Sequence, residues 1–304
     1  MKYMLETNNL TKSYHNFVAL KSFNMHVPKG AIYGFVGKNG AGKTTLIRLI
    51  CGLQEPTSGT YKICGVENNS LRINRIRRRM GAVVESPAIY LDMSAKDNIR
   101  HQYLTLGVPT DSGIDKLLNL VGLSNTKSKK VRNFSLGMRQ RLGIAISLAN
   151  NPDFLVLDEP INGLDPEGII EMRELILKLN QEYGITVLIS SHILDELSRL
   201  ATHYGFIDDG KMIKEISAKE LEKNCRKCIQ IEVSDTKILS YVLDKMNAEY
   251  NIADDHNASI YTDLNIGELI SSLAKENCKV EKLKEQDESL ESFYMGLIGG
   301  KHYA

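Results

Sequence analysis

A glycine-rich run near the N-terminus has the residue types and spacing that suit phosphate binding. It fits the pattern G-x-x-x-x-G-K-[ST], and Thr45, which follows it directly, belongs to the same candidate site. Glycines let backbone N–H groups turn inward around a triphosphate, and a following helix directs its positive end at the same anion. Lys43 would contact the β- and γ-phosphates, and the Thr44 hydroxyl would bind Mg²⁺. The residues of this phosphate loop are Gly37, Lys38, Asn39, Gly40, Ala41, Gly42, Lys43 and Thr44.

Two adjacent carboxylates follow an apolar run further along the chain. The run 154–157 is typical of a strand buried on both faces of a parallel sheet, and it ends in Asp158 and Glu159. The carboxyl edge of such a sheet is where α/β proteins bind ligands. Asp158 would hold Mg²⁺, often through water, and Glu159 would polarise the water that attacks the γ-phosphate. Beside the phosphate loop, this pair predicts hydrolysis of a nucleoside triphosphate.

A third stretch, F-S-L-G-M-R-Q-R, begins at Phe134, and its serine lies 23 residues before Asp158. Ser135 can cap a helix that continues to Leu148, so that the helix N-terminus and the small Gly137 face a phosphate. An ordinary helix cap would explain this serine when it is considered alone. Its position between the phosphate loop and the carboxylates gives it a functional meaning.

Taken together, these motifs resemble the ABC (ATP-binding cassette) family. The stretch from Phe134 is similar to the family signature L-S-G-G-Q, in which Ser135 and Gly137 match while Leu136 and Met138 depart from the pattern. The resemblance implies that the nucleotide is ATP, with Mg²⁺, and that the chain is an ATPase. It also implies a homodimer in which Lys43 of one copy and Ser135 and Gly137 of the other hold each ATP.

Three further positions agree with the ABC family in the expected order. The segment 162–165, N-G-L-D, resembles the D-loop, and His192, after the apolar run 186–191, resembles the catalytic switch histidine. Tyr14 resembles the aromatic residue that stacks on adenine. The resemblance spans about residues 3 to 215. It implies catalytic roles for Glu159 and His192.

The elements that must position these residues alternate between strands and helices. The run 31–36 predicts a strand that enters the phosphate loop, the run 44–53 predicts the helix after it, and the run 186–189 predicts a second buried strand. The resemblance implies an α/β P-loop NTPase fold with a RecA-like core and an antiparallel β subdomain. We expect this nucleotide-binding domain to cover residues 1–215, with a helical subdomain at about 86–150.

The remaining residues, 216–304, have a different pattern. Predicted strands and helices follow one another in the order β-α-β-β-α, which indicates a small α+β domain of the ferredoxin-like type. None of the nucleotide motifs lies in this part of the chain. We therefore expect an accessory or regulatory role for it.

Composition limits the partners of the protein. The 304 residues have a formal net charge of only +1, so no global field draws the chain to nucleic acid or to an anionic membrane. The arginine-rich run 72–79 lacks interleaved aromatic residues, which favours a solvated helix face over a nucleic-acid contact. Five irregularly spaced cysteines and an N-terminus without an apolar core indicate the cytoplasm.

A transport function would require a second chain, because no apolar run reaches the roughly 18 residues that a membrane helix needs. We expect a separate transmembrane permease, with this chain bound peripherally to the inner face of the cell membrane. The alternatives are a soluble ABC ATPase that acts on ribosomes or DNA, and a P-loop kinase or GTPase. The kinase or GTPase interpretation leaves the signature and the switch histidine unexplained.

Glu85 stands where the ABC family normally has a glutamine. Together with the S-L-G-M signature and the additional C-terminal portion, this residue resembles the ATPases that protect bacteria against bacitracin and lantibiotic peptides. We predict that Glu85 lies close to Mg²⁺ or the attacking water and couples metal occupancy to movement of the permease, without being the general base.

Overall fold

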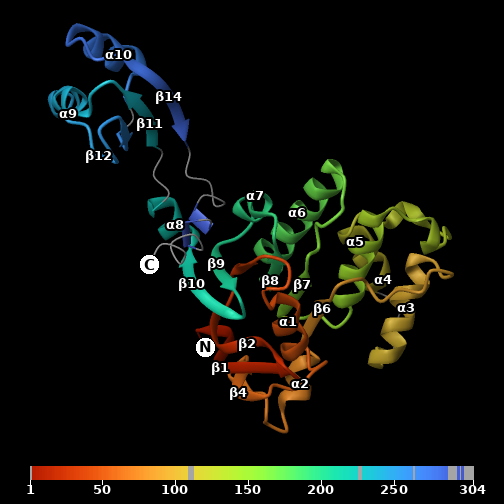
Figure 1. The fold of residues 1–304 in the computed structure, drawn as a ribbon. Coiled ribbons are helices and arrows are strands. Elements are labelled where there is room, and N and C mark those ends of the chain that lie inside the picture. The colour runs from red at the N-terminus through yellow and green to blue at the C-terminus, as the bar shows by residue number, and fades with distance from the viewer. Residues whose placement is uncertain are drawn as a thin grey trace. The chain divides into compact units, whose positions relative to one another are not determined.

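The computed structural model divides into two compact units, residues 1–218 and 219–304 (Figure 1). It describes residues 2–108, 113–224, 228–262, 264–286, 293–294 and 296–297. Within these residues, none of the helices is both long and apolar enough to cross a membrane.

An antiparallel sheet at the start of the first unit contains a hairpin of two long strands, and the first of these strands ends at Tyr14. Apolar residues alternate with polar ones in its second strand, where Phe23, Met25 and Val27 point into the core. Tyr14 pairs with Phe17 at the tip of the hairpin. The sheet has the order β2-β1-β4-β5, with strands β1 (Tyr3–Tyr14), β2 (Phe17–Pro28), β4 (Ser58–Ile63) and β5 (Val66–Glu67).

The second sheet of this unit brings the predicted site segments together. Its order is β10-β9-β3-β8-β7-β6, and all neighbours are parallel except β10 and β9. Every residue of β3, β7 and β8 is buried, as the apolar runs 154–157 and 186–189 predicted for β7 and β8. Because these three strands are parallel, the residues that follow them meet at one edge. The strands are β3 (Ile32–Val36), β6 (Met80–Val83), β7 (Phe154–Asp158), β8 (Thr186–Ser191), β9 (His203–Asp208) and β10 (Lys211–Ser217).

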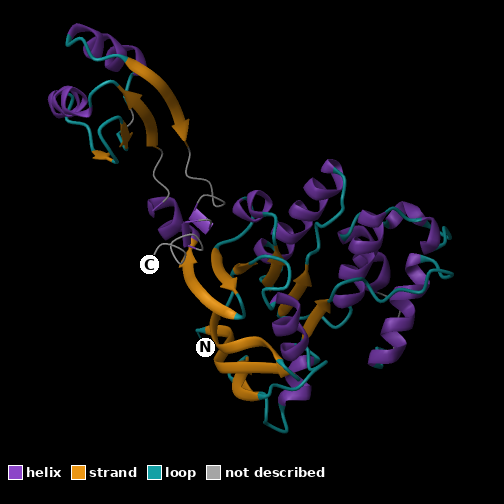
Figure 2. Cartoon of the chain, viewed as in Figure 1, coloured by secondary structure: helices purple, strands orange, loops and turns teal. Residues whose placement is uncertain are grey.

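Helices follow the strands, and several begin at a side-chain cap. Ser94, Ser135 and Asp165 each accept a hydrogen bond from a backbone N–H in the first turn of the helix that follows. A helical group packs beyond the β6 edge of the sheet, where α5 contacts β6 (Figure 2). It contains α3 (Ala95–Leu106), α4 (Ile114–Leu120), η2 (Ser124–Thr126), η3 (Val131–Asn133) and α5 (Leu136–Ser147). The other helices are α1 (Lys43–Ile50), α2 (Ile73–Arg77), α6 (Pro166–Gln181) and α7 (Leu194–Ser198).

The arginine-rich run is only partly a solvated face. Arg72, Arg75 and Arg78 are exposed. Arg77 is instead half-buried and bonds both the Tyr61 hydroxyl and the Asn74 side chain. The long aliphatic stem of arginine explains this placement, because it can pack inward while the guanidinium finds polar partners.

The second unit has a β-α-β-β-α-β order, one strand more than the sequence analysis expected. All its strand pairs are antiparallel, and the order β12-β13-β11-β14 is that of a ferredoxin-like fold. The additional strand β14 (Val280–Gln286) has mostly charged residues, which hid its pairing with β11. The other elements are α8 (Ala218–Asn224), which begins at the unit boundary, β11 (Cys228–Val233), α9 (Thr236–Lys245), β12 (Tyr250–Ile252), β13 (Asn257–Ile260) and α10 (Ile266–Lys275).

Candidate active site

The phosphate loop joins β3 to α1, and its glycines are required by geometry. A Cβ atom on Gly37 would lie 2.5 Å from Ile207 Cγ2, and one on Gly42 would lie 2.6 Å from the Ala19 carbonyl oxygen. Gly42 also has a φ of 112°, a left-handed conformation that residues with a Cβ rarely adopt. Larger residues would therefore push the loop away from the strands that hold it.

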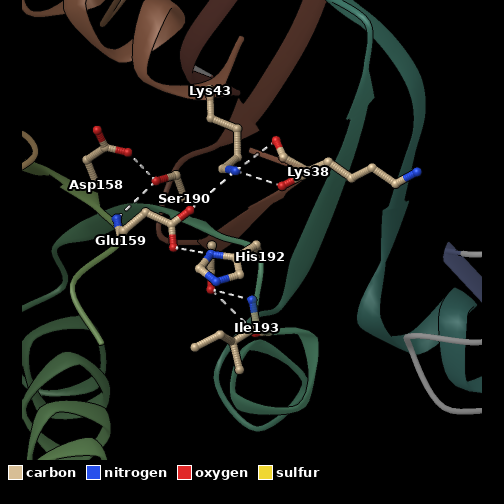
Figure 3. Close-up of polar contacts among 9 residues, drawn as sticks. Lys38, Lys43, Asp158, Glu159, Ser190, His192 and Ile193 are labelled. Atoms are coloured by element: carbon tan, nitrogen blue, oxygen red, sulfur yellow. Dashed lines mark hydrogen bonds and ion pairs between the residues drawn. The ribbon is translucent and has the colours of Figure 1, made fainter. Parts of the chain in front are cut away.

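Lys43 lies inside this loop with only 6% of its surface exposed. Its Nζ donates to the carbonyl oxygens of Gly37, at 2.6 Å, and Lys38, at 3.3 Å, and forms an ion pair with Glu159 Oε1 at 3.3 Å (Figure 3). The ammonium group is thus positioned between the loop backbone and the carboxylate at the end of β7.

Asp158 and Glu159 leave the end of β7 in different directions (Figure 3). Asp158 is 2% exposed, and its Oδ1 accepts a hydrogen bond from Ser190 Oγ on β8 at 2.5 Å. The Glu159 backbone N–H donates to the same Ser190 Oγ at 3.1 Å. Glu159 has a φ of 50°, an uncommon conformation for a residue with a side chain. Ser190 thereby fixes the turn that separates the two carboxylates.

His192 completes the cluster from the end of β8. Its Nδ1 lies 2.8 Å from Glu159 Oε2, so each oxygen of Glu159 has a nitrogen partner. The Glu159 side chain is 19% exposed and that of His192 is 35% exposed. A carboxylate that is ordered in this way, yet still reached by solvent, is suited to accept a proton from a water molecule.

Mg²⁺ fits the donor atoms at this edge of the sheet. Asp158 is a buried carboxylate with no Lys, Arg or His partner among the described residues, and buried charges are normally paired or bound to a metal. The Thr44 hydroxyl, at the start of α1, is a second hard oxygen donor.

The described residues contain no group of three or more His, Cys, Asp or Glu side chains that could hold a metal. Mg²⁺ commonly uses one or two protein ligands and completes its shell with water and substrate phosphates. Asp158 and Thr44 fit that pattern.

Tyr14 and Ser135 lie in other parts of the first unit. The Tyr14 hydroxyl donates to Gln54, and Lys12 Nζ lies 5.2 Å from the centre of the Tyr14 ring. Ser135 is exposed at the start of α5, where its Oγ accepts a hydrogen bond from the Met138 N–H at 3.2 Å. In the described part of the chain, neither residue shares a hydrogen bond or ion pair with the Lys43–Glu159–His192 cluster.

Glu85 has a partner that the sequence analysis did not identify. Its Oε1 pairs with Arg48 on α1, its side chain is 56% exposed, and its φ is 60°. The described residues give it no hydrogen bond to Asp158 or Thr44. Ser190 was also missed, although two serines at the end of a strand with an apolar centre were a usable signal.

Comparison with known proteins identifies the family. The ABC transporter family profile matches residues 20–162. The bacitracin transport ATP-binding protein BcrA of Enterococcus faecalis is 38% identical over 305 residues, which cover 99% of this chain and 98% of the relative. The chain belongs to the ABC transporter ATP-binding proteins.

Two further comparisons describe this ABC transporter ATP-binding protein in more detail. The lantibiotic transport ATP-binding protein SrtF of Streptococcus pyogenes is 48% identical over 212 residues, covering 70% of this chain and 90% of the relative. A solved dimeric ATP-binding cassette in a post-hydrolysis state, bound to ADP and Pi, has a TM-score of 0.64 and 26% identity, over 71% of this chain and 99% of that one.

The family settles which of the sequence interpretations is correct. The chain is an ATP-binding and ATP-hydrolysing subunit of an ABC transporter. A P-loop kinase or GTPase is excluded by this membership, and both relatives are named as transport proteins, which disfavours the soluble ABC ATPase.

Proposed function

We propose that this ABC transporter ATP-binding protein powers the export of a bacitracin-type peptide antibiotic through a separate transmembrane permease. It would act on the inner face of the cell membrane. The observation that carries this proposal is the similarity to a bacitracin transport protein over 99% of the chain, which extends through both compact units. A lantibiotic is the second candidate substrate, and the 48% identity to a lantibiotic transport protein supports it.

In the proposed reaction, Glu159 is the general base. Its Oε2 is oriented by His192, and its Oε1 is free to accept a proton from water once the Lys43 ammonium turns to the phosphates of ATP. Mg²⁺, held by Asp158 and Thr44, would neutralise the charge on the β- and γ-phosphates. The buried position of Lys43 inside the loop supports its role as the phosphate contact.

Each ATP site would be shared between two copies of the chain. Ser135 is exposed, and in the described part of its own chain it shares no hydrogen bond with Lys43. We infer that Ser135 and Gly137 of a second copy complete the site, and that Tyr14 stacks on the adenine. The dimeric state of the solved ATP-binding cassette supports this arrangement.

The permease would dock beside Glu85. A groove of about 540 Å³ lies there, lined by Val84, Ser86 and Pro87 on either side of Glu85 and by Gly143 and Ser147 on α5. A groove with a mixed apolar and polar lining fits a short permease helix. We infer that Glu85 and Arg48 transmit changes in the nucleotide site to this groove.

The test is to express the chain together with a candidate permease in a bacitracin-sensitive bacterium. We expect resistance with the wild type and none with Glu159→Gln, because the amide keeps the shape of the side chain but cannot accept the proton. The purified variant should bind ATP normally, accumulate as a nucleotide-bound dimer and hydrolyse about 100-fold more slowly.

Two other results would each contradict a different part of the proposal. Protection against lantibiotics but not bacitracin would replace the substrate with the second candidate. Normal turnover by Glu159→Gln would remove Glu159 from the role of general base.

A further inference from the structure

Within one chain, Leu136 of the signature lies close to Gly163 of the D-loop, and Leu164 of the D-loop lies close to Gly137 of the signature. We call this reciprocal arrangement the interlock. A Cβ atom on Gly163 would lie 3.3 Å from Leu136 Cδ2, and one on Gly137 would lie 3.7 Å from Leu164 Cδ2. The leucine of each segment therefore lies close to the side of the other segment's glycine where a Cβ atom would stand. Leu136 occupies a position where the family signature has glycine, so this contact depends on a departure from the family pattern.

The D-loop side of this interlock is tied closely to Glu159. Asn162 N donates to the Glu159 carbonyl oxygen at 3.1 Å, and Leu164 N donates to the Ile161 carbonyl oxygen at 3.3 Å. Ile161 is 2% exposed, which anchors the middle of the segment. These two successive hydrogen-bonded turns and the buried Ile161 restrict the backbone between Glu159 and Leu164. A displacement of residues 163–164 should therefore also move Glu159.

The signature side is tied equally closely to Ser135. Leu136 is the first residue of α5 and follows Ser135 directly, and the Ser135 cap fixes the first turn of this helix. Leu136 is 46% exposed, so the interlock lies at the surface of the chain, and only part of the leucine is covered. A group that binds to Ser135 thus acts one residue away from the contact with the D-loop.

We propose that Leu136 is a positioning residue that couples the signature to the general base of the same chain. This inference rests on the proposed roles of Ser135 and Glu159. When a nucleotide held by a second copy engages Ser135 and Gly137, Leu136 presses on Gly163 and sets the position of Glu159 towards the nucleotide of its own chain. The two ATP sites of the dimer are then linked through one leucine–glycine contact in each copy.

The test compares ATPase kinetics of purified full-length variants. Leu136→Ala should lower kcat about fivefold, a size typical of a residue that transmits coupling without touching a ligand. Its equilibrium affinity for ATP and its Tm should remain at the wild-type values, because the phosphate loop is untouched. Leu136→Met should restore most of kcat, since the flexible thioether side chain can still reach Gly163. Leu104→Ala, an equally simple truncation of a 72% exposed leucine on α3, is the matched control and should not change kcat.

A double-mutant cycle with Leu164→Ala tests the interlock itself. We expect Leu164→Ala to lower kcat about fivefold as well. If the two leucines form one unit, the double variant loses no more kcat than the more affected single variant, whereas two independent fivefold effects would multiply to about 25-fold. Wild-type kcat in Leu136→Ala, multiplicative losses, or a parallel fall of ATP affinity and Tm would each overturn the proposal. Failure of the proposed function is distinguishable, because it would appear as normal turnover in Glu159→Gln, a variant that leaves Leu136 intact.

Discussion

Glu159 shows how far a single residue depends on its neighbours. Lys43 and His192 each hold one oxygen of its carboxylate, and Ser190 holds its backbone N–H. These partners come from two segments, the loop after β3 and the end of β8, which meet Glu159 at the end of β7 because β8 is the parallel neighbour of both β3 and β7. The contacts with His192 and Ser190 can therefore keep the carboxylate ordered when the Lys43 ammonium turns to the phosphates of ATP.

Glu85 differs from Glu159 in its surroundings, and this difference predicts how substitutions of this single residue act. Its charge is balanced by Arg48 at a more exposed position. Glu85→Gln should retain most of the ATPase activity, because the amide oxygen can still accept a hydrogen bond from Arg48 and the proposed general base is Glu159. Glu85→Ala should lower transport more than hydrolysis.

Both rates can be measured in vesicles that contain the permease. Arg48→Gln serves as a matched variant, and it should resemble Glu85→Ala if the pair acts as one unit. Abolition of hydrolysis by Glu85→Gln would mean that the general base is Glu85.

At the scale of elements, the start of α5 determines what the signature can do. The Ser135 cap orders the first turn, and the helix N-terminus carries a partial positive charge that suits a phosphate. Ser135 is exposed and, among the described residues, shares no hydrogen bond with Lys43, which supports the proposal that this turn binds a nucleotide held by a second copy.

A mixing experiment tests whether α5 acts on the second copy. Ser135→Arg and Lys43→Ala should each be inactive alone, because each lesion damages both sites of a homodimer. In a mixed dimer the two lesions meet at one site, so the other site is intact, and some ATPase activity should return. If mixtures are no more active than either parent, the shared-site arrangement is contradicted.

At the scale of the whole molecule, the boundary between the units lies after β10, and β10 belongs to the first unit. Glu215 on β10 accepts hydrogen bonds from the Tyr33 hydroxyl at 2.5 Å and from the His26 N–H at 2.7 Å. At the turn before β10, Gly210 N donates to the Ala41 carbonyl oxygen of the phosphate loop at 3.0 Å.

We predict that a chain cut after Ala218 still folds and binds ATP, because all of these contacts remain. A chain cut after Gly210 is the matched comparison. It should fold poorly, because it loses β10 and leaves the buried Tyr33 hydroxyl without Glu215. Isothermal titration with ATP and circular dichroism distinguish the two. Loss of ATP binding in a soluble, folded chain that ends at Ala218 would show that the second unit contributes to the nucleotide site.

The second unit illustrates which features a sequence pattern can miss. The helices α9 and α10 and the first three strands follow from the alternation of apolar residues. Strand β14 does not, because Glu281, Lys282 and Lys284 interrupt that alternation on an edge strand. Charged edge strands are common because they discourage pairing with other chains, so their signal in the sequence is weak.

The sequence by itself determined the phosphate loop, the carboxylate pair and the family. These features are contiguous, and covalent spacing together with glycine backbone preferences fixes their local geometry wherever the chain folds. The tertiary structure alone decided that Glu159 lies between Lys43 and His192, that Glu85 pairs with Arg48, and that Leu136 lies against the D-loop. Contacts between distant segments depend on strand order and on how each helix packs, and these are properties of the whole fold that no local pattern encodes.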